Sequence, residues 1–557
     1  MQYRVTTKEM LGLHMYKSKL NQALLMAAGL SLSAISLSSL AVTVPNGVKL
    51  DQVQELVRGN GTEVESLDPQ KVSGVPEANI IRDLLEGLIN QDDEGNLVPG
   101  VATSWTTEDN KVWIFNLRKD AKWSNGDPVT ADDFVYTWRR LGDPNTGSPY
   151  ASYLSMTAMK NATNIIEGKK PIESLGVEAL DKNTLQVTLD NPLSYFASML
   201  VHTSMKPVHK ATVEKYGDKW TSVDTYVSNG AYKLEKWVVN ERIVLNRNPN
   251  YWDNANTVIN MVTYLPIENQ VAEMNRYLAG EVDITNEVPS EHIKRLKKDY
   301  SDDLKITPYL CTYYYEFNML KKPFDNLDVR KALSYAIDRD VLTKLVIGKG
   351  DTSAYNFTHL ATNGLEIDTP EFAKMTQKER VAEAKKLMAK AGFDKNNPLE
   401  FSVLYNTSEN HKKIAVALAS MWKQSLGVKV ILENQEWKSY LDTKRQGNFE
   451  VSRAGWCGDY NEASTFLGIM RTGHSQNYPK YASNAFDKSL DNALNAKTNA
   501  ERAGFYKTAE KLLAQDMPII PMYHYVNARL VNPQIGGYPM KNPEHNIYSK
   551  DMYIIAK

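Results

Sequence analysis

The sequence predicts a mixed protein of the α/β or α+β class, because strand-like and helix-like patterns alternate along the chain instead of being segregated. Trp113, Phe115 and Leu117 alternate with Val112, Ile114 and Asn116, and residues 184–189 alternate apolar and polar side chains; both period-2 patterns are typical of strands. Residues 376–392 instead repeat apolar side chains at helical spacing, and they begin with the capping-box pair Thr376 and Glu379. No internal repeat of about 20 to 50 residues is visible, so a solenoid is disfavoured.

Length and composition indicate a large globular chain with several domains. The chain has 557 residues, which is typical of roughly three or four domains. Hydrophobic residues make up 42% and charged residues 24%, so the chain can bury a sizeable core. Lys and Arg total 65 against 66 for Asp and Glu, and this balance argues against a nucleic-acid partner.

Residues 1–41 have the pattern of a cleaved export signal. Lys17 and Lys19 supply positive charge, residues 20–40 are apolar or small, and small residues precede the expected cleavage after position 41. Met15 is an alternative start, because the residues before it lack signal character. No cysteine stands at the cleavage point, so we expect a periplasmic protein without a lipid anchor. No later segment approaches about 18 consecutive apolar residues, so we expect no transmembrane helix.

The chain has two cysteines, Cys311 and Cys457. In an oxidising compartment they can pair, and the bridge would close a loop of 146 residues. The chain-entropy model gives such a loop about 4–5 kcal/mol of stabilisation. Two separately buried thiols are the alternative, and a thiol assay on the unfolded chain distinguishes the two states.

Motif searches give no candidate for a catalytic or metal site. The nine histidines form no i,i+4 pair, none lies near a cysteine, and no HExxH, GxSxG or strand-linked GxGxxG pattern occurs. We therefore expect no metal and no cofactor. A glycosidase-type carboxylate pair stays open, since such groups meet only in space. A large exported chain without a catalytic pattern favours a binding protein over an enzyme.

Several stretches of the sequence resemble one family in the same order along the chain. PGVATSWTTEDNKVWIFNLRKDAKWSNGDPVTADDFVYTW at 99–138 is similar to the signature of the peptide/nickel class of extracellular solute-binding proteins. Further matching stretches lie at 228–232, 248–253, 280–284, 308–318, 328–342, 404–413, 434–443 and 453–462. The stretches at 308–318 and beyond 404 narrow the resemblance to the periplasmic oligopeptide-binding proteins of enterobacteria and their relatives. It extends from about residue 44 to the C-terminus.

The resemblance implies a three-domain periplasmic binding protein fold, with two lobes hinged around the ligand and an extra domain beside one of them. The implied parts are the signal at 1–41, lobe I from 42–85, 210–310 and 527–557, domain II at 86–209, and lobe III at 311–526. Both cysteines then fall in lobe III, where the family has its disulfide.

The resemblance also implies a ligand site around Asp459, which matches the carboxylate that receives the α-ammonium of a peptide. A buried ion pair of this kind would fix the position of the ligand along the cleft. The alternative is a surface carboxylate in a glycine-rich loop. Other matching positions around the ligand channel are Tyr150, Glu316, Asn406, His411, Trp437, Arg453 and Trp456. For these the alternative is core packing, above all for Trp437.

Two positions depart from the pattern of the close relatives. Ser73 stands where they carry a glutamate that faces the ligand, and Lys444 stands where they carry an arginine for the carboxyl end of the ligand. Lysine keeps the charge but loses the bidentate fork of arginine. Arg445 next to it is a candidate for compensation. These departures leave the length and charge of the preferred peptide open.

The expected function is that of the periplasmic receptor of an ATP-driven importer, which binds short peptides between two closing lobes and delivers them to a membrane permease. We expect a monomer that is not an enzyme and binds no nucleic acid. The alternative is the same scaffold with murein tripeptide, haem or another modified or non-peptide ligand. A secreted hydrolase is a third hypothesis, motivated by the abundant carboxylates and aromatic residues.

Overall fold

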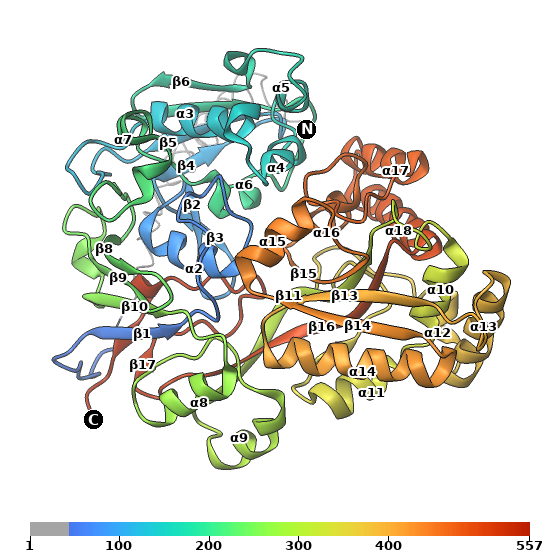
Figure 1. Cartoon of the computed structure of the whole chain (residues 1–557). Coiled ribbons are helices and arrows are strands. Elements are labelled where there is room, and N and C mark those ends of the chain that lie inside the picture. The colour runs from blue at the N-terminus through green and yellow to red at the C-terminus, as the bar shows by residue number, and fades with distance from the viewer. Residues whose placement is uncertain (1–43) are drawn as a thin grey trace, which may run out of the picture. The chain divides into compact units, whose positions relative to one another are not determined.

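Three β-sheets carry most of the strands in the computed structural model, which describes residues 44–557 (Figure 1). The predicted export signal at residues 1–41 lies outside the described residues. Within them, no helix is both long and apolar enough to cross a membrane. The described residues belong to one compact unit.

The first sheet brings together segments that are distant in the sequence. Its strands, in spatial order, are β1 (Glu55–Gly59), β10 (Met261–Leu265), β9 (Arg242–Arg247) and β8 (Tyr232–Val238). β1 pairs with β10 in parallel, whereas β10, β9 and β8 pair antiparallel. Period-2 burial along β9 shows that one face of this sheet packs against the core.

The second sheet contains both strands that the alternating patterns predict. Its strands, in spatial order, are β4 (Ala102–Thr106), β5 (Val112–Leu117), β7 (Thr184–Thr188) and β6 (Val177–Asp181). Trp113 and Phe115 of β5 are buried, as are Leu185 and Val187 of β7. The strand predictions at 112–117 and 184–189 are therefore confirmed, apart from Leu189, which lies one residue past β7.

The third sheet is built on two long strands. Its strands, in spatial order, are β12 (Thr352–Ser353), β16 (Ile519–Leu530), β11 (Leu304–Phe317), β15 (Val451–Cys457), β13 (Glu400–Asn406) and β14 (Lys429–Gln435). β11 and β16 are antiparallel over almost their whole length, with a register irregularity between Pro308 and Thr312. Figure 1 shows α14 (Glu409–Leu426) running alongside β13 and β14.

Helices surround these sheets. The larger ones are α2 (Val75–Leu84), α3 (Ala131–Gly142), α7 (Lys210–Tyr216), α8 (Gln270–Leu278), α9 (Ile293–Asp299), α10 (Leu327–Tyr335), α13 (Gln377–Lys390), α15 (Trp437–Arg445), α17 (Asn484–Leu494) and α18 (Asn499–Asp516). The shorter ones are α4 (Ala151–Met156), α5 (Ala162–Ile166), α6 (Phe196–Met199), α11 (Arg339–Val341), α12 (Glu371–Lys374) and α16 (Ser464–Leu467). Two small ribbons pair β2 (Ile89–Gln91) with β3 (Leu97–Pro99) and β17 (Ile535–Gly536) with β18 (Tyr553–Ile554).

Helix α13 forms where the capping box predicts it. The Thr376 side chain accepts from the backbone N–H of Glu379, and the Glu379 carboxylate accepts from the N–H of Thr376. Gly392 follows the helix with φ of 89°, the left-handed conformation that glycine supplies after a helix end. Ala384 and Met388 form the buried part of the predicted apolar face.

The prediction of a mixed helix and sheet class is confirmed, since strands and helices are interleaved along the described chain. The domain boundaries stay a prediction. The sheet with β4 to β7 lies inside the predicted domain II, but β11 and β16 each continue across a predicted boundary, at 310/311 and at 526/527.

Candidate functional site

A cavity of about 320 Å³ brings together most of the predicted ligand residues. Its lining includes the chain after β1, the start of α2, the ends of β13 and β15, the start of α15, the second half of β16 and the segment 544–546. Eight predicted residues line it: Ser73, Tyr150, Asn406, His411, Trp437, Arg453, Trp456 and Asp459. Glu316 and Lys444 do not.

Asp459 presents one satisfied and one unsatisfied carboxylate oxygen. Its Oδ1 accepts from the hydroxyl of Tyr150 at 3.2 Å and lies 3.4 Å from His202 Nε2. Its Oδ2 is buried and has no hydrogen-bond partner in the described structure. Burial raises the pKa of Asp459 well above its ordinary value. A ligand cation placed at Oδ2 would therefore relieve an unpaired buried acceptor.

His202 supports Asp459 as a neutral ring. The backbone N–H of Ser204 donates to His202 Nδ1 at 3.3 Å, which places the ring proton on Nε2, toward Asp459. Burial, followed by the charge of Arg82, lowers the pKa of His202 to about 3. The ring therefore supplies a hydrogen bond but no positive charge, so it does not compete with a ligand cation for Asp459.

The loop that carries Asp459 is held by the disulfide at the end of β15. Cys457 lies directly opposite Cys311 of β11, and the two form a disulfide. The N–H of Gly458 donates to Leu310 O at 2.8 Å, so the pairing of the two strands continues past the bridge. The N–H of Asp459 then donates to Thr465 Oγ1 at 2.8 Å. These contacts fix the direction in which the carboxylate leaves the strand.

Aromatic rings form a wall beside Asp459. Tyr150 stacks on His202 with ring centroids 4.6 Å apart, and on Trp456 at 6.4 Å. Trp456 belongs to β15, whereas Tyr150 lies just before α4. The wall therefore combines segments far apart in the chain, and rings of this kind offer large apolar area to a ligand.

Arg453 lies on β15 and is held by neutral groups. Its Nη1 donates to Asn406 Oδ1 at 3.3 Å and its Nη2 donates to Tyr525 OH at 2.7 Å, while the guanidinium lies 4.6 Å from the ring centre of Tyr313. No carboxylate of the described chain lies within 4.0 Å of it as an ion-pair partner. Burial and then the charge of Arg453 lower the pKa of His411 well below its ordinary value.

Glu316 and Lys444 pair with each other behind the cavity wall. Lys444 Nζ lies 2.7 Å from Glu316 Oε1, and the two side chains are 7% and 0% exposed. Ser452 Oγ donates to the same oxygen at 2.6 Å. Burial opposes the charged ammonium of Lys444, but the Glu316 carboxylate outweighs it and raises the pKa of Lys444. The two charges therefore pair with each other through Glu316 Oε1, and neither side chain lines the cavity.

Arg445 does not take the place of Lys444 in the cavity. Its Nη2 lies 2.8 Å from Glu65 Oε2, and its Nη1 also contacts the Glu65 carboxylate. This two-point contact joins α15 to the segment that follows β1. The side chains are 27% and 14% exposed, so the pair is partly shielded from water.

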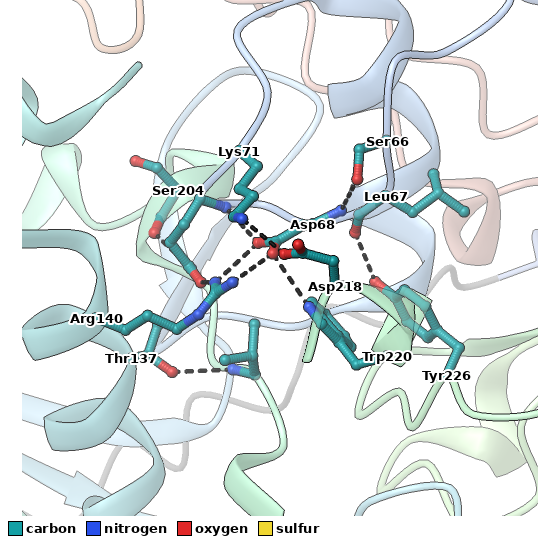
Figure 2. Close-up of polar contacts among 12 residues, drawn as sticks. Ser66, Leu67, Asp68, Lys71, Thr137, Arg140, Ser204, Asp218, Trp220 and Tyr226 are labelled. Atoms are coloured by element: carbon teal, nitrogen blue, oxygen red, sulfur yellow. Dashed lines mark hydrogen bonds and ion pairs between the residues drawn. The ribbon is translucent and has the colours of Figure 1, made fainter. Parts of the chain in front are cut away.

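Ser73 reaches the cavity through a segment that is fixed by a buried ion pair. Figure 2 shows Asp68 between Arg140 and Trp220: Arg140 Nη1 donates to Asp68 Oδ1 at 2.9 Å, and Trp220 Nε1 donates to Oδ2 at 3.1 Å. Tyr226 OH donates to Leu67 O at 3.1 Å, as the same view shows. The segment 66–71 is thus tied to α3 and to the chain after α7, and it delivers Ser73 to the lining.

Trp437 also lines the cavity, and its indole nitrogen is engaged. Trp437 Nε1 donates to Glu77 Oε1 at 3.3 Å, and the N–H of Glu65 donates to the same oxygen at 2.8 Å. The ring is partly buried against Tyr440 at 5.8 Å. Trp437 therefore packs against Tyr440 and also lines the cavity.

Comparison with known proteins shows the family to which the chain belongs. Residues 96–478 match the model of bacterial extracellular solute-binding proteins, family 5 Middle. The chain belongs to this family. It is 54% identical over 540 residues to the periplasmic oligopeptide-binding protein OppA of Salmonella typhimurium, covering 97% of this chain and 99% of that protein. It is 48% identical over 526 residues to the periplasmic murein peptide-binding protein MppA of Escherichia coli, covering 94% and 98%.

Solved structures of such proteins also match. Haemophilus influenzae OppA in complex with the peptide RPPGFSPFR has a TM-score of 0.90 at 48% identity, and one structure of E. coli MppA has 0.90 at 47%; each covers 91% of this chain and 100% of the other. The unliganded open form of MppA has a TM-score of 0.65, covering 92% and 99%. The predicted periplasmic binding protein fold is therefore confirmed.

Sequence reasoning missed several groups that line the cavity of this solute-binding protein. They are Arg82, His202, Arg529, Glu544 and His545. None belongs to a local motif, and each enters the site only because strands and loops from distant parts of the chain meet there. No spacing in the sequence indicates such a meeting, so only the tertiary structure reveals them.

Proposed function

We propose that this protein is the periplasmic receptor of an ATP-driven importer and binds short peptides. Asp459 carries the proposal: a buried carboxylate with one free oxygen, facing a cavity in a chain of this family. A peptide α-ammonium supplies the cation that such an oxygen lacks. The proposal draws support from relatives that are named for oligopeptide binding.

The remaining predicted residues take roles around the peptide chain in this proposal. Arg453 receives a ligand carboxylate, because its guanidinium is buried against neutral partners. Tyr150, Trp437 and Trp456 offer apolar area to side chains, and Asn406 and the neutral His411 offer hydrogen bonds. Water in a cavity of this kind accommodates different peptide side chains.

Transport requires a partner and a change of shape. In the proposal the chain acts in the periplasm, delivers its ligand to a membrane permease, and is a receptor without catalytic activity of its own. The two lobes have the boundaries given by the resemblance, and ligand binding shifts them toward a closed arrangement. The two TM-scores for one relative, 0.90 and 0.65, support a fold that occurs in more than one arrangement.

Calorimetry of trialanine with the mature protein tests the ammonium anchor. Asp459→Asn should weaken binding by about 2–5 kcal/mol, because it leaves the ammonium without a counter-charge. N-acetyl-trialanine should lose a comparable amount with the wild-type protein. Thr407→Ser, a mild change at another lining position, controls for general disturbance of the cavity. Equal affinity for trialanine and its acetylated form would refute the anchor.

A murein tripeptide is the second candidate ligand. It is favoured by the similarity to MppA and by Ser73 and Lys444, which depart from the pattern of the oligopeptide-binding relatives. Native mass spectrometry of the protein purified from its periplasm distinguishes the candidates by the mass of the ligand. A set of masses from ordinary peptides supports the first candidate, and a single mass containing diaminopimelate supports the second.

A further inference from the structure

Two guanidinium groups that line the cavity, the half-buried Arg82 and the buried Arg529, lack a carboxylate partner. Arg82 Nη2 donates to Asn79 Oδ1 at 2.9 Å, and its Nε is buried without a partner. Arg529, only 4% exposed, donates from Nε to Asn527 Oδ1 at 3.0 Å. Neither forms an ion pair within 4.0 Å in the part of the chain that the structure describes, although both line the cavity. Arginine stays charged even when buried, so these two charges are uncompensated.

The carboxyl groups nearby do not neutralise them. Burial raises the pKa of Glu273 to about 8 and that of Glu544 to about 7, so protonated forms are populated near neutral pH. Glu287 is bonded to Lys349 Nζ. Glu268, at the cavity edge, accepts from the Thr62 hydroxyl at 3.3 Å. None of these four carboxyl groups forms an ion pair with Arg82 or Arg529 in the described part of the chain.

His545 lies within the influence of both guanidiniums. It is 5% exposed, and its Nε2 is buried without a partner. Burial lowers the pKa of His545 well below its ordinary value, and the charges of Arg529 and Arg82 lower it further. The ring of Tyr309 packs against it at 5.4 Å. A neutral imidazole with an open nitrogen thus lines the same cavity as the two guanidiniums.

This cluster adjoins the end of the cavity that holds Asp459. The charge of Arg82 acts on His202, whose Nε2 lies 3.4 Å from Asp459 Oδ1. Glu544, the neighbour of His545 in the chain, lines the same cavity as Asp459, and its carboxyl raises the pKa of Asp459. A side chain that leaves the peptide next to its α-ammonium would therefore extend toward these groups.

We infer that Arg82, Arg529 and His545 form a subsite for a carboxylate side chain on the first residue of the peptide. The inference rests on the proposed peptide-binding function. A glutamate or aspartate side chain supplies the missing negative charge and gives the guanidinium and imidazole groups an acceptor. The receptor thus prefers peptides that begin with an acidic residue.

Calorimetry with matched peptides measures this preference. Glu-Ala-Ala should bind the wild-type protein at least about tenfold more tightly than Gln-Ala-Ala, which has the same shape without the charge. Ala-Glu-Ala and Ala-Gln-Ala locate the subsite, and this second pair should differ much less. A preference confined to the second position, or absent from both pairs, would overturn the inference.

Replacing His545 tests the missing counter-charge directly. His545→Asp places a carboxylate beside the guanidiniums and should bring the Glu/Gln ratio to one or below, whereas His545→Asn should keep it. The backbone at His545 has φ of 56°, which Asp and Asn both adopt readily, so the two variants differ mainly in charge. A ratio that survives His545→Asp would overturn the inference.

Substitutions of Arg82 test how much its charge contributes to the ratio of affinities for Glu-Ala-Ala and Gln-Ala-Ala. Arg82→Gln should reduce the ratio to about twofold or less, and Arg82→Lys should retain a preference because it keeps the charge. Arg295→Gln, on the exposed side of α9, removes an equal charge away from the cavity and should leave the ratio unchanged.

If trialanine itself fails to bind the wild type, the proposed function fails, and the inference with it. If trialanine binds without a Glu/Gln difference, the inference alone fails.

Discussion

Asp459 and Glu77 are both buried carboxyl groups, but burial leaves them different roles. Asp459 keeps a free oxygen that faces the cavity, so a ligand cation can satisfy it. Glu77 receives the N–H groups of Glu65 and Trp437 on one oxygen, and its other oxygen is buried without a partner. Both carboxyls have two polar neighbours at one oxygen and none at the other, so their roles differ by location: Asp459 lines the cavity and Glu77 does not.

Glu77 should make stability depend on pH. Burial raises its pKa from 4.5 to about 7, so between these values the unfolded chain releases a proton that the folded chain keeps. The free energy of unfolding therefore falls as pH rises through this window. Glu77→Gln removes the effect, so the variant should gain up to about 3 kcal/mol relative to wild type between pH 4 and pH 8.

Urea unfolding of both proteins at the two pH values measures this gain. Glu178→Gln, an exposed position on β6, is the control and should show no pH-dependent difference from wild type. A Glu77→Gln variant whose stability relative to wild type is the same at pH 4 and pH 8 would show that Glu77 titrates normally.

The strands of the third sheet illustrate the element scale. The alternating pattern at 112–117 and the capping box at 376–379 could be recognised in the sequence because they are local. The length of β11 and β16 could not be recognised in the sequence, because it depends on pairing between residues about 200 positions apart. The same pairing, together with β15, places Cys311 opposite Cys457.

Removing the disulfide should destabilise the protein without abolishing its strand pairing. The double variant Cys311→Ser with Cys457→Ser should lose about 3–5 kcal/mol of unfolding free energy, because the bridge closes a separation of 146 residues. Urea unfolding measures the loss, and wild type kept in reductant should show a similar loss. Two titratable thiols in the unfolded, unreduced wild type would contradict the bridge.

At the scale of the whole molecule, contacts between distant segments close the walls of the cavity. Glu65 follows β1, and Arg445 ends α15, yet their side chains meet in a two-point contact. Trp437, at the start of α15, likewise contacts Glu77 of α2. If the proposed lobes open and close, these contacts form only in the closed arrangement and favour it.

Breaking the Glu65–Arg445 contact should weaken peptide binding modestly. Glu65→Gln or Arg445→Gln should each raise the dissociation constant of trialanine about two- to fivefold, since a partly exposed ion pair contributes about 0.5–1 kcal/mol. Calorimetry measures the change, with Lys438→Gln on the exposed face of α15 as the control.

The charge-swapped double variant, Glu65→Arg with Arg445→Glu, should recover part of the affinity. If the double variant binds as weakly as the sum of both single losses predicts, the pair does not stabilise the bound state.

The sequence by itself determined the mixed fold class, the local strands and caps, the family resemblance and eight of the residues that line the cavity. These follow from short-range periodicity, or from residues that stand in recognisable order. Only the tertiary structure decided that Lys444 turns to Glu316 and that Arg445 turns to Glu65. It alone showed that Arg82 and Arg529 enter the cavity without a counter-charge. The physical reason is that the partner of a charged side chain is chosen by proximity in space, after distant segments have packed, and no local pattern records that choice.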